Sequence, residues 1–368
     1  MKIASVEAFP VSLPLKKPFT IALGTMTHSP HVVVKMTTED GIVGYGEAST
    51  WHVVYGYDQH ELAWVIDHYL GPAVRGMDVT DLESIHARMD AVLPKNLMAK
   101  AGIEIACQDA RAKTLGTSLS RLIGGVQKNP LEVIEVVDIV PTKDAAKMAV
   151  RFVQSGFRCL KIKIGLDPKE DIERVRVVRE AVGPDIRLRI DGNQGYDRTS
   201  ALKVSLAVEE LDLQWIEQPL PDWDLEGSAM LADAVHTPIA LDESLYTVHD
   251  VYKIAKAKAA DVINIKVSKC GGITNSFKIA YAAQSMGIPC FLGGCIETGV
   301  GAAAALHFGA CSPNLFSGLE IAGSGPFTDD IITEPFVAQH GAVRLPEGPG
   351  LGVAVDEEKL RFYSRKRD

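Results

Sequence analysis

Charged side chains recur at the ends of a series of short apolar runs, and their types suit chemistry on a carboxylate substrate. Neighbouring groups follow one another at steps of about 25 residues, the length that one strand, one helix and two loops occupy. They are Lys161 and Lys163 in KIKIG, Asp191 in IDGN, Glu217 in IEQP, Asp242 in LDES and Lys266 in NIKVSKCGG. A regular step of this kind places every group at the same end of successive strands.

Three of these groups are carboxylates, and they predict a metal site. Asp191, Glu217 and Asp242 would converge on one point, where their mutual repulsion is costly unless a cation lies among them. Hard oxygen ligands without Cys or His favour Mg²⁺ or Mn²⁺ over Zn²⁺. The competing interpretation is that each carboxylate only caps the following helix. Three carboxylates at the same regular spacing favour the metal site over helix capping.

Two lysines would then flank the metal from nearly opposite strands. Near a metal and a second cation, a lysine pKa is expected to fall towards neutrality, so Lys163 and Lys266 could act as acid and base. Lys161 lies two residues before Lys163 and points to the same side, where its charge would lower the pKa of Lys163 further. The alternative, a solvated strand face, conflicts with the burial of barrel strands on both sides.

Together these groups predict proton transfer next to a carboxylate. The metal would bind the substrate carboxylate and stabilise an enediolate, while a lysine removes or donates the α-proton.

The elements that must position these residues alternate between strand and helix from Leu131 onwards. Eight strands are expected, which is the number in a (β/α)₈ barrel. They are Leu131–Val140, Cys159–Ile164, Ile186–Ile190, Leu213–Ile216, Ile239–Leu241, Val262–Ile265, Cys290–Gly293 and Gly318–Ile321. An open doubly wound sheet is expected to have a glycine-rich phosphate-binding loop after its first strand. In this sequence Pro141-Thr142-Lys143 follows that strand instead. The barrel is therefore predicted, with the charged groups at its C-terminal rim.

The first 125 or so residues show a different pattern of strands followed by helices, which is typical of an α+β module. Ile3–Leu13 is strand-like, and Val32–Met36 and Ile42–Gly46 form a hairpin signal around Glu39-Asp40-Gly41. Helical patterns follow. They are Asp58–Tyr69, Thr80–Val92 and Ala99–Leu115.

Composition excludes several classes of protein. The 368 residues suggest two domains, and a net charge of −9 without a dominant basic cluster argues against nucleic-acid binding. No apolar run approaches the roughly 18 residues that a membrane span needs. The six cysteines contain no CxxC pair and are expected to be reduced, as in a cytoplasmic protein.

The motifs KIKIG, IDGN, IEQP, LDES, NIKVSKCGG and GGCIETG resemble those of the enolase superfamily, muconate-lactonizing subgroup, over essentially the whole chain. The resemblance implies that Asp191, Glu217 and Asp242 bind Mg²⁺ or Mn²⁺, and that Lys163 and Lys266 are the acid/base pair assisted by Lys161. It also implies a capping domain (1–125, joined by 343–368) over a catalytic (β/α)₈ barrel (126–342). Loops near Ile21–Thr27 and Trp51–Tyr57 would close over the substrate.

The superfamily hosts several reactions on one metal site, so the reaction must come from local features. GEAST…YGYD resembles the capping loop of muconate cycloisomerases, and Glu320 in GLEIAG resembles their eighth-strand glutamate. A metal-dependent cycloisomerase of the muconate type is the first expectation. A racemase or epimerase of N-acyl amino acids or dipeptides is the second and an acid dehydratase the third. Dipeptide epimerases carry Asp-x-Asp where Leu319-Glu320-Ile321 stands, which weakens the dipeptide variant.

The side chains expected to contact substrate come from the capping loop and the barrel rim. They are Trp51, Tyr57, Asn193, Glu297 and Glu320. Trp51, Tyr55 and Tyr57 form an aromatic cluster that could instead pack the domain interface, and Glu297 could be only a helix N-terminal charge. A small carboxylate is the expected partner, and the resemblance implies a homo-oligomer, with an octamer plausible. A non-catalytic binding protein with this barrel fold would have lost a metal ligand or a catalytic lysine, but all of the predicted metal ligands and lysines are present.

Overall fold

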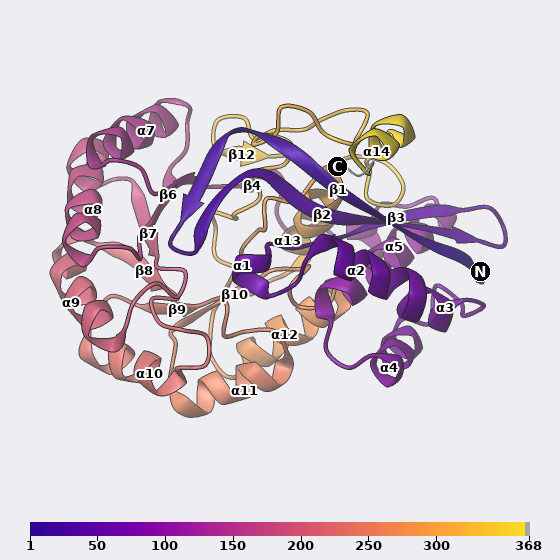
Figure 1. Cartoon of the computed structure of the whole chain (residues 1–368), viewed down its shortest axis with the longest axis horizontal. Helices are drawn as coiled ribbons and strands as arrows, with labels where there is room; N and C mark the ends of the chain where they lie inside the picture. The colour runs from indigo at the N-terminus through magenta and orange to yellow at the C-terminus, as the bar shows by residue number, and fades with distance from the viewer. Residues whose placement is uncertain (365–368) are drawn as a thin grey trace.

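The computed structural model describes residues 1–364, which form an N-terminal module and a barrel (Figure 1). The N-terminal module joins a three-stranded antiparallel sheet to a group of helices. Its elements are β1 (Ile3–Ile21), β2 (Gly24–Thr38), β3 (Val43–Ser49), α1 (His52–Tyr55), α2 (Gln59–Val65), a π-helical turn (Ile66–Leu70), α3 (Gly71–Val74), α4 (Leu82–Val92), α5 (Leu97–Thr114) and α6 (Leu119–Leu122).

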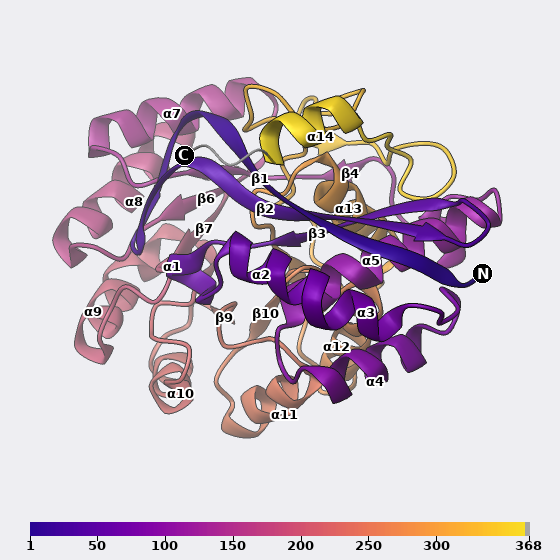
Figure 2. The ribbon, with the colours of Figure 1, turned by 45° about the vertical axis from the view of Figure 1, so that its right-hand side comes forward.

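The predicted hairpin is confirmed, and a longer one precedes it. Thr37 pairs with Val43 across the expected turn between β2 and β3. β1 continues well past Leu13, and Ile21 pairs with Gly24 at the tip of a long β1–β2 ribbon. This ribbon extends from the N-terminal module across the mouth of the barrel (Figure 2).

Helix α5 packs against the sheet at very short range, because small residues meet there. A Cβ on Gly46 of β3 would lie 2.0 Å from the carbonyl oxygen of Gly102, and one on Gly44 would lie 2.1 Å from that of Ala106. The helix is buried over most of its length. These glycines therefore fix how the helices of the module stack on β1–β3.

The barrel alternates parallel strands with helices that form an outer ring (Figure 1). The sheet order is β11-β10-β9-β8-β7-β6-β5, so strands that follow one another in sequence are neighbours. The strands are β5 (Glu135–Val137), β6 (Cys159–Lys163), β7 (Arg187–Asp191), β8 (Leu213–Glu217), β9 (Ile239–Leu241), β10 (Val262–Ile265) and β11 (Cys290–Leu292). The helices are α7 (Thr142–Gln154), α8 (Pro168–Val182), α9 (Arg198–Val208) with a 3₁₀ turn (Glu209–Leu211), α10 (Leu225–Ala234), α11 (Val248–Ala257), α12 (Ile273–Ser285) and α13 (Gly299–Cys311).

Two of the eight predicted strands differ from expectation. The first divides: β4 (Leu131–Glu132) pairs with β12 (Ala342–Val343), and only β5 joins the barrel sheet. The eighth, Gly318–Ile321, is irregular, yet its backbone bonds to both edges of the sheet. Leu319 accepts from the Ile134 amide at 3.0 Å, and Glu320 donates to Leu292 at 2.9 Å. Isolated bonds of this kind close the barrel where a regular strand was expected.

Contacts between distant parts of the chain tie the C-terminal segment to the N-terminal module. The last helix, α14 (Glu357–Ser364), lies beside β1 (Figure 2). Its Glu357 pairs with Lys35 and accepts from the Tyr45 hydroxyl at 2.7 Å. The C-terminal segment is thus packed against the N-terminal sheet.

All six cysteines are free thiols. Across residues 1–364, no helix combines the length and the apolar character that crossing a membrane requires.

Candidate active site

The charged groups predicted from the sequence meet at the C-terminal rim of the barrel strands. Lys163 ends β6, Asp191 ends β7 and Glu217 ends β8. In the strand register Lys163 lies beside Asp191, and Asp191 beside Glu217. Asp242 and Lys266 directly follow β9 and β10. All of these side chains are buried, so the parallel sheet has gathered them into one site.

Lys161 is the most highly connected lysine of the site. Its Nζ lies 2.6 Å from Glu217 Oε2, 2.7 Å from Glu320 Oε2 and 3.2 Å from Asp191 Oδ2. Lys161 therefore joins strands β7 and β8 to Glu320, which lies in the irregular eighth strand position.

Lys163 is held by two residues of the β7 end. Its Nζ donates to Asp191 Oδ2 at 2.6 Å and to Asn193 Oδ1 at 2.8 Å. The backbone of Asn193 adopts a φ of 39°, and its side-chain Nδ2 donates to Glu243 Oε1 at 3.0 Å. The left-handed turn after β7 thereby links Lys163 to the residue that follows Asp242.

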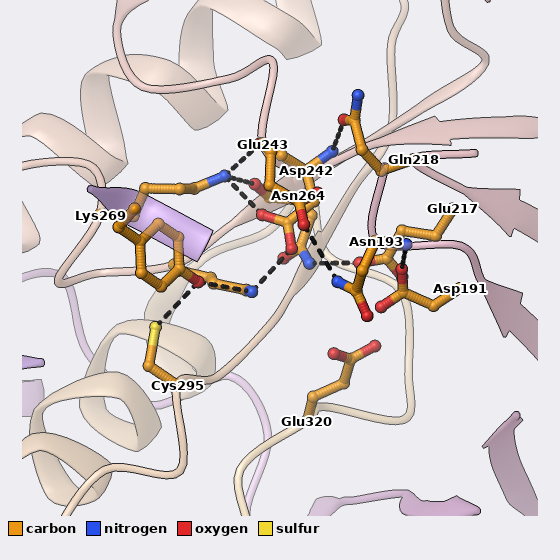
Figure 3. A network of polar contacts seen from close by, with 12 residues as sticks. Asp191, Asn193, Glu217, Gln218, Asp242, Glu243, Asn264, Lys269, Cys295 and Glu320 are labelled. Atoms are coloured by element: carbon orange, nitrogen blue, oxygen red, sulfur yellow. Dashed lines mark hydrogen bonds and ion pairs between the residues drawn. The ribbon is translucent and has the colours of Figure 1, made fainter. Parts of the chain in front are cut away.

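Asp242 lies between two lysines (Figure 3). Lys266 Nζ is 2.6 Å from its Oδ2, and Lys269 Nζ is 2.7 Å from its Oδ1. Lys266 also donates to the Tyr55 hydroxyl at 3.0 Å, and that hydroxyl lies 3.3 Å from the Cys295 sulfur. A tyrosine of the N-terminal module thus reaches a lysine at the end of a barrel strand.

Burial and nearby carboxylates act on the pKa values of two lysines of the site. Burial disfavours the charge of Lys266, but Asp242 and Tyr55 outweigh it, so its pKa lies well above the ordinary value. Burial also opposes the charge of Lys161, and Glu217 and Glu320 raise its pKa. Carboxylates are the nearest charges of both groups, whereas the fall expected for Lys163 and Lys266 requires a metal beside them and stays a prediction.

The carboxylates respond to burial and to one another. Burial, followed by the charge of Asp191, raises the pKa of Glu217 well above its ordinary value. Burial and the charge of Asp242 raise the pKa of Glu243 to about 7. Within residues 1–364, Glu243 Oε2 is buried and has no hydrogen-bond partner. A positive charge among these carboxylate oxygens would offset both the burial and the repulsion that raise the two pKa values.

The three carboxylates at the strand ends are the predicted metal ligands. In the described chain, no three His, Cys, Asp or Glu side chains are arranged as a metal site, and the carboxylate oxygens face lysines at 2.6 to 3.2 Å instead. The donor chemistry nevertheless fits a hard divalent cation, because Asp191, Glu217 and Asp242 offer buried carboxylate oxygens from three adjacent strands.

A cavity of about 520 Å³ opens onto these lysines. Lys161, Lys163, Lys266, Asn193 and Glu320 form its charged and polar floor. The β1–β2 ribbon, the capping loop and the loop after β11 form a further part of its wall. These wall residues include Phe19, Ile21, Met26, Trp51, Val54, Tyr55, Cys295 and Ile296. Residues of both expected loops therefore line the cavity, and its wall is largely apolar.

Not every predicted substrate contact faces this cavity. Trp51, Asn193 and Glu320 line it, whereas Tyr57 packs against the core of the N-terminal module and its carbonyl accepts from Thr50. Glu297 lies outside the lining, and its Oε1 accepts from the backbone amide of Cys295 at 2.7 Å.

Sequence reasoning missed three residues that the site uses, and it grouped Tyr55 with Trp51 and Tyr57 as one aromatic cluster. Of the two tyrosines, Tyr55 lines the cavity, because the short helix α1 turns it towards the barrel. Glu243 and Lys269 stand beside predicted residues in LDES and KVSKCGG, so adjacency was an available signal. Cys295 carried no signal, since its contact with Tyr55 joins positions 240 residues apart.

Comparison with known families gives two matches that cover most of the chain. Residues 3–124 match the mandelate racemase / muconate lactonizing enzyme N-terminal domain, and residues 144–359 match the enolase C-terminal domain-like family.

Individual relatives align over nearly their whole length. The N-succinyl-L-Arg/Lys racemase of Bacillus cereus is 35% identical, over 98% of this chain and 97% of that protein. Muconate cycloisomerase 1 of Rhodococcus opacus is 33% identical, over 99% of each. A solved dipeptide epimerase from Enterococcus faecalis, in complex with Mg and the dipeptide L-Leu-L-Tyr, has a TM-score of 0.92 at 34% identity, covering 96% of this chain and 100% of that one.

Proposed function

The chain belongs to the enolase superfamily, and from this premise we propose that it is a divalent-metal-dependent isomerase that moves a proton α to a substrate carboxylate. One observation carries the proposal: Lys163 and Lys266 approach one cavity from β6 and from the end of β10, on either side of three buried carboxylates.

Each lysine has a distinct role in this proposal. Lys163 and Lys266 are separated by β7, β8 and β9 in the sheet, so they face a substrate in the cavity from different sides. One removes the α-proton and the other returns a proton to the opposite face. Lys161 stays bound to Glu217 and Glu320 and keeps positive charge beside the reacting carboxylate.

Asp191, Glu217 and Asp242 would hold the cation, and Mg²⁺ or Mn²⁺ suits their oxygens. When bound, the cation supplies positive charge that stabilises an enediolate. The Mg-bound dipeptide epimerase is similar to this chain and supports the choice of metal.

Two reactions of this class have specific support. Cycloisomerisation of a muconate-type diacid is favoured by the tyrosine of the capping loop and by Glu320, both of which line the cavity. Racemisation or epimerisation of an N-acyl amino acid or dipeptide is favoured by the access of two lysines to the same cavity. The relatives include enzymes named for each reaction.

Proton NMR in D₂O tests the proposal with Mg²⁺ or Mn²⁺ and three probes: N-succinyl-arginine, L-Ala-L-Glu and cis,cis-muconate. We expect deuterium at Cα with inversion, or lactone formation. Lys266→Ala should lower the rate by at least about 10²-fold in both directions while the affinity for Mg²⁺ is kept.

The outcomes separate the candidates. Inversion of an amino-acid derivative contradicts the cycloisomerase, and lactone from muconate contradicts the racemase. Unchanged turnover in Lys266→Ala would overturn the acid/base assignment itself. We further propose the division into a capping domain (1–125 with 343–368) and a barrel (126–342). The homo-oligomer and the cytoplasmic location stay predictions.

A further inference from the structure

Tyr55 connects the N-terminal module to the ends of two neighbouring barrel strands. Its hydroxyl accepts a hydrogen bond from Lys266 Nζ at 3.0 Å, which leaves its own proton free to point at Cys295 Sγ, 3.3 Å away. Lys266 follows β10 and Cys295 follows β11. The hydroxyl therefore sits at the contact between module and barrel.

The backbone and the ring of Tyr55 belong to the N-terminal module. It is the last residue of α1, which ends at Gly56 with a φ of 74°. A side chain at that φ would be strained, so the glycine permits the sharp end of the helix. Its ring also packs against the core of the module. The module thus presents the hydroxyl at a fixed place.

The two lysines of the proposed acid/base pair differ in this respect. Among the described residues, Lys163 is bound by Asp191 and Asn193, which both belong to the barrel. Lys266 is bound by Asp242 of the barrel and by Tyr55 of the N-terminal module. The two lysines are almost equally buried, at 8% and 7% exposed, so they form an internally matched pair.

We propose that Tyr55 is a positioning residue for Lys266: it holds the ammonium group over one face of the substrate, so that proton transfer on the Lys266 side depends on the N-terminal module and transfer on the Lys163 side does not. The inference rests on the proposed function for its consequence in turnover, but the Tyr55–Lys266 contact can be tested without it.

Without the hydroxyl, Lys266 keeps a single anchor and its Nζ can rotate about Asp242. Tyr55→Phe retains the ring and its packing, so the change is confined to the hydroxyl and its contacts with Lys266 and Cys295. Tyr69→Phe is the matched control, because Tyr69 lies on the same module, is 44% exposed and is remote from the cavity lining.

The first measurement is reductive methylation of lysines in the full chain, followed site by site with peptide mass spectrometry. In Tyr55→Phe, Lys266 should be modified at least about threefold faster than in the wild type, since one of its two hydrogen-bonded partners is lost. Lys163 should keep its wild-type rate, and Tyr69→Phe should change neither. Equal rates at Lys266 in Tyr55→Phe and the wild type would overturn the proposal.

The second measurement is deuterium exchange at Cα, with the two enantiomers of N-succinyl-arginine assayed separately. Tyr55→Phe should slow exchange of the enantiomer whose α-proton faces Lys266 by about tenfold and leave the other within about twofold. Equal slowing of both enantiomers would overturn the positioning role. If the wild type exchanges no probe, the proposed function fails on this substrate class, and the methylation rates alone decide the role of Tyr55.

Discussion

Asp242 shows how a single buried carboxylate organises the site at the scale of one residue. Burial opposes its charge, but Lys266 and Lys269 outweigh that effect and hold its pKa below the ordinary range. Lys269 is fully buried and also donates to the backbone carbonyls of Asp242 and Asn264. The Asp242 carboxylate is therefore ionised and fixed in orientation.

The first prediction concerns metal binding at this residue. Asp242→Asn removes the charge but keeps the shape, so its dissociation constant for Mg²⁺ should rise at least about tenfold. Isothermal titration calorimetry with MgCl₂ measures the change. Glu226→Gln, an exposed acid on α10, is the control and should bind like the wild type. Wild-type affinity in Asp242→Asn would remove Asp242 from the proposed ligand set.

At the scale of elements, the N-terminal module is attached to the barrel through carboxylates at helix N-termini. Glu104 of α5 accepts from the amides of Ile273 and Thr274, at 2.8 and 3.0 Å, where α12 begins. Glu47 of β3 accepts from the amides of Thr298 and Gly301, where α13 begins. These amides lack partners within their own helices. A buried carboxylate accepts their hydrogen bonds, and its negative charge interacts favourably with the helix dipole.

The second prediction follows from this attachment. Glu104→Ala leaves the α12 amides unpaired in a buried place and should lower the free energy of unfolding by about 2–4 kcal/mol. Urea unfolding followed by circular dichroism measures the loss. Glu61→Ala, at an exposed position of α2, serves as the comparison. A loss no larger than that of Glu61→Ala would show that this junction does not stabilise the fold.

At the scale of the whole molecule, His307 joins three parts of the chain. Its Nδ1 accepts from the Ser120 amide of α6 at 3.2 Å, and its Nε2 lies 3.0 Å from the carbonyl oxygen of Leu351 in the C-terminal segment. A neutral imidazole with its proton on Nε2 satisfies both contacts. Burial lowers its pKa to about 4, because a charged imidazolium would lose its hydration there, and the contact with the Leu351 carbonyl opposes this only in part.

The third prediction is the pH dependence that this histidine gives to stability. Between pH 6.5 and 4 the unfolded chain binds a proton at this site that the folded chain does not, so stability falls as the pH falls through that window. The loss at pH 4.5 relative to pH 7.5 is about 2–3 kcal/mol. His307→Gln should remove this part of the loss in urea unfolding at the two pH values. Exposed His249→Gln should retain it, and an unchanged difference in His307→Gln would contradict the assignment.

The sequence by itself determined the parts of this protein that repeat along the chain. Parallel strands alternate with helices at a steady interval, and the residue that ends each strand is read directly from the apolar run before it. For this reason the barrel and the meeting of Lys163, Asp191, Glu217, Asp242 and Lys266 at one rim could be predicted. The β2–β3 hairpin followed from an equally local signal, the turn Glu39-Asp40-Gly41.

Only the tertiary structure decided the features that depend on contacts between distant residues. The eighth strand position is irregular although its backbone bonds to both edges of the sheet, and no local pattern specifies the curvature of that sheet. Tyr55, and not Tyr57, faces the cavity because α1 ends at Gly56 against a barrel built more than 200 residues later. Periodicity encodes which face of an element is buried, but the partner of a loop side chain is set by the packing of whole domains.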